Sequence, residues 1–134
     1  MKYYRKISAA LAILFAITCL IFLFIPNEVL SFFNALSGSA GMKETPLNGL
    51  GFYLILAVGY MYLVTLISLL MYKYPKNRFF PLLLANGKLA SSLLSLYMFI
   101  SHQPYLIYLV NFLVDGAIGS GVLILYFLLI KKAK

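Results

Sequence analysis

Long runs of apolar residues alternate with shorter polar segments along the chain, and this alternation predicts the architecture. Four runs, at residues 7–25, 47–72, 80–101 and 105–130, are close to the roughly 20 residues that a helix needs to cross a bilayer. Turn and helix-start signals separate the runs. The sequence therefore predicts an all-α membrane protein, a four-transmembrane-helix up-down bundle that forms one integral membrane domain over residues 1–134.

The first run follows a basic start, an arrangement that also resembles a secretory signal. Two features argue against cleavage. The apolar run is longer than a typical signal core, and no clear small-x-small cleavage site follows Pro26. We therefore expect residues 7–25 to form an uncleaved first span.

A short amphipathic helix is predicted between the first two spans, at residues 27–36. Pro26 should close the first span, and Asn27 should cap the short helix. Its apolar residues fall mostly on one face: Val29, Leu30, Phe32, Phe33 and Leu36. Because this helix is too short to cross a bilayer, we expect it to lie in the membrane interface.

Two further signals shape the link to the second span. The small residues at 37–41 predict a flexible joint. Thr45 and Pro46 then form a helix-start signal, with threonine as the cap and proline at the first helical position. The second span should therefore begin at about Leu47.

Composition and charge agree with a membrane location. The chain is 63% hydrophobic and 10% charged, and a soluble domain of this length could not cover so much apolar surface. The net charge of +8 arises at the ends of the spans, with three basic residues each at the N-terminus, at 73–78 and at the C-terminus. The positive-inside rule places these three segments in the cytoplasm. We expect an integral protein of the bacterial cytoplasmic (inner) membrane, with cytoplasmic N- and C-termini.

Several functional classes are disfavoured by what the chain lacks. No basic stripe is interleaved with exposed aromatic residues, so we expect no nucleic-acid partner. The single cysteine, Cys19, excludes a two-cysteine redox or metal site within one chain. The one histidine, His102, lies in a turn far from any intramembrane acid. We therefore predict no catalytic set, no metal site and no cofactor, and we expect that the protein is not an enzyme.

Two charges interrupt the third and fourth runs, and full-length spans rarely tolerate such charges unless they are paired or functional. At 1.5 Å per helical residue, Lys88 lies roughly 20 Å and Asp115 roughly 16 Å below the external end. These depths predict an ion pair. Tyr60 lies at similar depth, and Asn111 and Ser92 share the faces of the two charges. The predicted intramembrane polar cluster is Lys88, Asp115, Asn111, Tyr60 and Ser92.

Small residues at four-residue spacing indicate where the third and fourth spans pack closely. They are Gly87, Ser91 and Ser95 in the third span, and the pairs Gly116–Ser120 and Ala117–Gly121 in the fourth. Close packing would bring the two charged residues within reach of each other.

Two functions remain open from the sequence. In the favoured one, the Lys88–Asp115 pair clasps the third and fourth spans of a small accessory or scaffolding subunit of a larger membrane complex. The alternative is a small oligomeric transporter, or a proton- or ion-linked carrier, that uses the pair in its pathway. Both predict the lipid bilayer as surroundings and either other membrane subunits or further copies of the chain as partners. A cavity that reaches Asp115 would favour the carrier.

Overall fold

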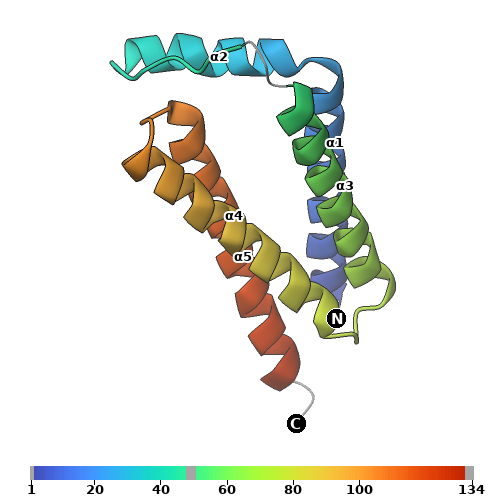
Figure 1. Ribbon diagram of the computed structural model, residues 1–134. Coiled ribbons are helices and arrows are strands. Elements are labelled where there is room, and N and C mark those ends of the chain that lie inside the picture. Colours follow the sequence, from blue (N-terminus) through green and yellow to red (C-terminus); the bar gives the residue numbers. More distant parts are fainter. Residues whose placement is uncertain (1, 48–50, 132–134) are drawn as a thin grey trace.

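The computed structural model describes residues 2–47 and 51–131, and its regular secondary structure there is entirely helical (Figure 1). The five helices are α1 (Lys2–Phe24), α2 (Pro26–Ser39), α3 (Gly51–Lys73), α4 (Phe79–Ser101) and α5 (Leu106–Lys131). All except α2 are long and apolar enough to cross a membrane. The prediction of an all-helical protein with four membrane-spanning helices is confirmed.

The four long helices are arranged as two pairs rather than as an evenly packed set. The most extensive contacts join α4 to α5 and α1 to α3, whereas α3 and α4 share fewer. Figure 1 shows the pairs meeting near the α3–α4 turn and diverging toward the opposite end, where α2 lies across them. Helix α2 contacts both α1 and α5, and it therefore bridges the two pairs at their wider end.

The break between α1 and α2 differs in detail from the prediction. Helix α1 begins at Lys2, so the basic start is helical, and it ends at Phe24. Ile25 is the N-cap of α2 and offers no side-chain hydrogen bond, and Pro26 occupies the first helical turn. The predicted Asn27 cap is therefore wrong. Proline is favourable at this position because it has no backbone N–H that would need a partner.

Helix α2 also extends further than predicted, through Ser39. The expected flexible joint at 37–41 is instead a defined helix end, in which Gly41 has a φ of 66° and the Met42 N–H donates to the Ser37 carbonyl at 2.8 Å. This is the Schellman arrangement, which glycine favours because it has no Cβ. The Ser37 hydroxyl donates back to the Phe33 carbonyl at 2.9 Å.

Asn34 of α2 fixes the chain that follows the helix. Its Nδ2 donates to the Thr45 carbonyl at 2.9 Å, and its Oδ1 accepts from the Thr45 N–H at 2.8 Å. Both backbone groups of Thr45 are thus occupied, and residues 42–47 are not helical. The predicted helix start at Thr45–Pro46 is therefore wrong, and residues 48–50 of the predicted second span lie outside the described residues. The third and fourth predicted spans agree with α4 and α5 to within one residue.

Candidate functional site

Lys88 and Asp115 form a buried ion pair between α4 and α5. The Lys88 Nζ donates to Asp115 Oδ1 at 2.8 Å, and the two side chains are 3% and 5% exposed. This confirms the pairing that was predicted from their depths along the two helices. Among the described residues it is the only ion pair.

The Lys88 ammonium also lies over aromatic rings of α1 and α3. Its Nζ lies 4.6 Å from the ring centroid of Phe15 on α1 and 5.1 Å from that of Tyr60 on α3. The negative face of an aromatic ring attracts a cation, more strongly where water is excluded. Phe15 itself is 2% exposed. The single charge of Lys88 therefore connects all four long helices.

Asn111 extends the polar surface along α4 and α5. Its Nδ2 donates to Ser95 Oγ at 2.6 Å and to Ser91 Oγ at 3.2 Å. The two serines, which were predicted only as small packing residues, thus belong to the polar network. Four-residue spacing along α4 places both hydroxyls on one face.

Ser92 makes no side-chain contact with the ion pair that the hydrogen bonds record, and it does not line the cavity beside that pair. Its hydroxyl donates to the Phe112 carbonyl at 2.8 Å, and its side chain packs against Gly116. Ser92 therefore belongs to the contact between α4 and α5. Tyr60, in contrast, lies beside Lys88, and its buried hydroxyl makes no hydrogen bond within the described part of the chain.

A cavity of about 450 Å³ lies between the two helix pairs and is lined by residues of α1, α3, α4 and α5. Helices α4 and α5 contribute its polar wall: Lys88, Ser91, Ser95, Asn111 and Asp115. Helices α1 and α3 contribute mostly apolar side chains, among them Phe15 and Met61. Cavities of this size, apolar with a few convergent polar groups, are typical of small-molecule sites.

The asymmetry of the two walls limits what the cavity can bind. One wall offers a cation, a carboxylate, hydroxyls and an amide, and the opposite wall offers rings and aliphatic groups. A small molecule with one charged end and an apolar body would match both walls. In the described residues, no three His, Cys, Asp or Glu side chains lie close enough together to hold a metal ion.

Phe15 is the site residue that the sequence did not indicate. An apolar ring in an apolar span carries no local signal, and its role arises only because α1 faces α4 across the cavity. Cys19, on the same helix, donates weakly to the Val58 carbonyl at 3.7 Å and so belongs to the α1–α3 contact. His102 lies at the end of α4, where its ring meets that of Tyr97 at 5.6 Å between centroids.

Comparison of the chain with protein-family models, curated proteins and solved structures finds no match.

Proposed function

We propose that the protein is a small integral membrane carrier, working as an oligomer, whose substrate binds in the cavity beside Lys88 and Asp115. The observation that supports this most directly is the cavity itself, which reaches both charged side chains. A purely structural clasp would need no such space, because a buried ion pair depends on the geometry of the pair and on additional hydrogen bonds to it.

The ion pair suggests how transport would be coupled. Lys88 and Asp115 together carry no net charge in the low-dielectric interior. An anionic group of a substrate can replace Asp115 as the partner of Lys88, which leaves the Asp115 carboxylate unpaired. An unpaired carboxylate in a membrane is unfavourable, so a proton that enters together with the anion would balance its charge. The loaded cavity is then neutral again, and one anion moves together with one proton.

The second candidate, an accessory or scaffolding subunit, is supported by a different residue. Tyr62 is 64% exposed and lies eleven residues from either end of α3, so roughly 16 Å from each end. Within the described residues no hydrogen bond to its hydroxyl is found. A neighbouring membrane helix could supply an acceptor there, since polar side chains commonly bond across helices in lipid. The same face would serve a second copy of the chain or a different protein.

Uptake into proteoliposomes tests the carrier. A thermal-shift screen of small monoanions with apolar bodies should first identify ligands, because a ligand that binds only the folded state raises its melting temperature. Liposomes that contain only this chain should accumulate such an anion when the outside is acidic. Asp115→Asn should abolish accumulation, whereas Glu44→Gln, the same chemical change at an exposed residue, should not alter it.

The subunit hypothesis predicts the opposite result. The purified chain would then accumulate none of the screened anions, and native mass measurement after gentle extraction would show it bound to a different membrane protein. A homo-oligomer with transport supports the carrier. A lone monomer without transport contradicts both functions.

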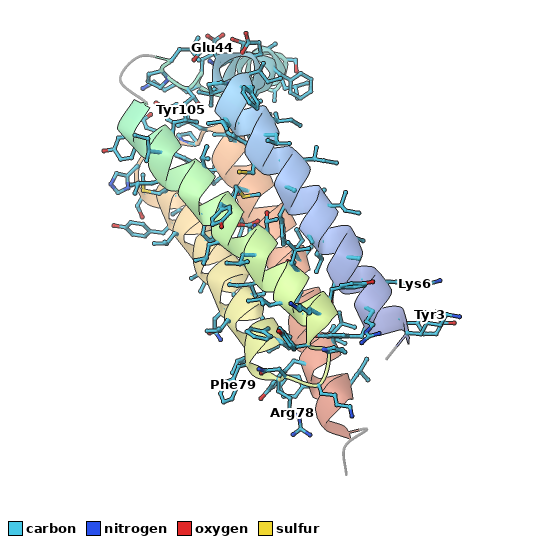
Figure 2. All side chains as sticks on the ribbon, turned by 90° about the vertical axis from the view of Figure 1, so that its right-hand side faces the viewer. Tyr3, Lys6, Glu44, Arg78, Phe79 and Tyr105 are labelled. Carbon is cyan, nitrogen blue, oxygen red and sulfur yellow. The ribbon has the colours of Figure 1, made fainter. Side chains whose placement is uncertain are left out.

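We further propose that the four long helices cross the bacterial inner membrane as an up-down bundle with both termini in the cytoplasm and α2 in the outer interface. Figure 2 shows Lys6 and Arg78 at one end of the molecule and Glu44 at the other, in agreement with the positive-inside rule. Single cysteines introduced at Lys43 and Lys76 should react with an impermeant thiol reagent from opposite sides of the membrane. Reaction of both from the same side would exclude this topology.

A further inference from the structure

Two adjoining cavities lie at the end of the molecule that carries the start of α1 and the α3–α4 turn. The first, of about 590 Å³, lies between the first turns of α1 and residues 72–76, and Lys2, Arg5, Lys6 and Lys76 line it. The second, of about 530 Å³, is lined by Arg5 and the segment from Lys73 to Asn77. The two cavities share Arg5, Pro75 and Lys76.

The charge around these cavities has a single sign. The start of α1 and the α3–α4 turn carry six basic residues: Lys2, Arg5, Lys6, Lys73, Lys76 and Arg78. None of them forms an ion pair within that part of the chain. Of the three acidic residues, Glu28 lies in the first turn of α2 at the opposite end of the molecule (Figure 1). Glu44 also lies at that end (Figure 2), and Asp115 is already paired with Lys88. The cavities therefore present several cations without an acidic partner.

Hydrogen bonds define the conformation of the α3–α4 turn, which carries Lys73, Lys76 and Arg78. Pro75 is buried, the Asn77 N–H donates to the Tyr74 carbonyl at 3.0 Å, and the Asn77 Oδ1 accepts from the Phe79 N–H at 3.0 Å. This conformation places Lys76 beside the first turns of α1, where both line the same cavity. Membrane insertion alone favours basic residues at this end, but it does not require two separate segments to enclose a concave space.

We propose that this end of the molecule is a binding site for an anion with two phosphate groups, one in each of the adjoining cavities. Arg5 lines both cavities, and its planar guanidinium can donate paired hydrogen bonds to phosphate oxygens. The site lies at the ends of membrane-spanning helices, and basic pockets at this level bind lipid headgroups. The source of the phosphates is either a phospholipid headgroup or a free diphosphate.

Arg78 provides a matched control for Arg5. Both are arginines at the same end of the molecule, both are exposed, and Arg78 lines neither cavity. A diffuse positive surface would lose the same attraction on removal of either charge. A specific binding site would lose far more affinity on removal of Arg5 than on removal of Arg78.

Native mass spectrometry of the detergent-solubilised protein, titrated with diphosphatidylglycerol, tests the proposal. Wild type should bind one lipid molecule tightly. Arg5→Gln should weaken binding about 10-fold or more, Arg78→Gln should weaken it less than about threefold, and Arg5→Lys should restore part of the affinity. Size-exclusion profiles and melting temperatures equal to wild type would show that each variant is folded.

A competition titration with sodium pyrophosphate distinguishes the sources of the phosphates. If sodium pyrophosphate displaces the lipid at millimolar concentration, the site takes free diphosphates as well as headgroups. If pyrophosphate leaves the lipid bound, the site belongs to the headgroup together with its acyl chains. Equal weakening by Arg5→Gln and Arg78→Gln, or binding of phosphatidylcholine as tight as that of diphosphatidylglycerol, would overturn the proposal.

Discussion

Replacing either member of the Lys88–Asp115 pair alone should sharply reduce the amount of folded protein, and replacing both should restore much of it. Lys88→Met or Asp115→Leu leaves one charge buried without its partner, which typically costs about 3–5 kcal/mol. The double substitution leaves no charge, and two apolar side chains suit surroundings where the native pair is only 3% and 5% exposed. Folded yield after detergent extraction, measured for the wild type and the three variants, gives the coupling between the two positions.

The two single substitutions should differ in size because the surroundings of the pair favour a cation. In Asp115→Leu, the Lys88 ammonium keeps the rings of Phe15 and Tyr60 at 4.6 and 5.1 Å. In Lys88→Met, the Asp115 carboxylate loses its ion-pair partner, and the rings of Phe15 and Tyr60 offer no positive charge to replace it. We therefore expect Lys88→Met to be the more damaging change. If the loss of folded yield in the double variant equals the sum of the two single losses, the pair does not couple α4 to α5.

Transport must be measured separately from yield on these variants. If the pair serves only to join α4 and α5, the folded double variant keeps whatever function the wild type has. If Lys88 binds the substrate anion and Asp115 takes up the proton, the double variant folds but does not transport. The comparison separates a structural from a functional role of the same two residues.

The pair was predictable from the sequence because a helix has a fixed rise per residue. Depth along two antiparallel helices follows from counting, and a buried charge needs a partner, so Lys88 and Asp115 could be matched without a structure. Counting does not give the rotation of α1 about its own axis. The contact of Phe15 with Lys88 depends on that rotation, and no polar residue on α1 indicated it.

The ends of α2 were less predictable because they depend on contacts outside the local sequence. Thr45–Pro46 is a sound helix-start signal, but both backbone groups of Thr45 are bound by Asn34, eleven residues earlier. The small residues at 37–41 looked flexible, yet Gly41 with its φ of 66° ends the helix in a defined conformation. In both places, specific hydrogen bonds decide the backbone conformation, against the structure that the local sequence favours.

Of the glycines of α5 that were predicted to pack closely, Gly116 does so and Gly121 does not. Gly116 and Gly119 face α4, where an added Cβ would lie 2.9 Å from the nearest side-chain atom of Ser92 and of Leu89, respectively. Gly121, which was expected to pack, has open space around it. Two overlapping small-residue patterns were present in the sequence, and pattern matching alone cannot choose between faces of a helix that is apolar on all sides.

The choice of face predicts opposite effects for two chemically identical substitutions on α5. In Gly119→Ala, the new methyl group would lie 2.9 Å from Leu89 Cγ and 3.1 Å from the Leu89 backbone nitrogen. A side chain can change rotamer, but a backbone atom moves only if α4 moves, so the two helices must separate. Such overpacking typically costs about 1–3 kcal/mol. Thermal unfolding followed by circular dichroism in detergent should show a clearly lower melting temperature.

Gly121→Ala is the matched control, because a Cβ there would meet nothing within 4 Å. Alanine is favoured over glycine within a helix by about 1 kcal/mol, so this variant should melt at the wild-type temperature or slightly above it. The two substitutions lie two residues apart on one helix, and any general effect of alanine on α5 is common to both. Equal melting temperatures for Gly119→Ala and Gly121→Ala would mean that α5 does not present Gly119 to α4. The α4–α5 packing that brings Lys88 to Asp115 would then have to be rebuilt around a different face.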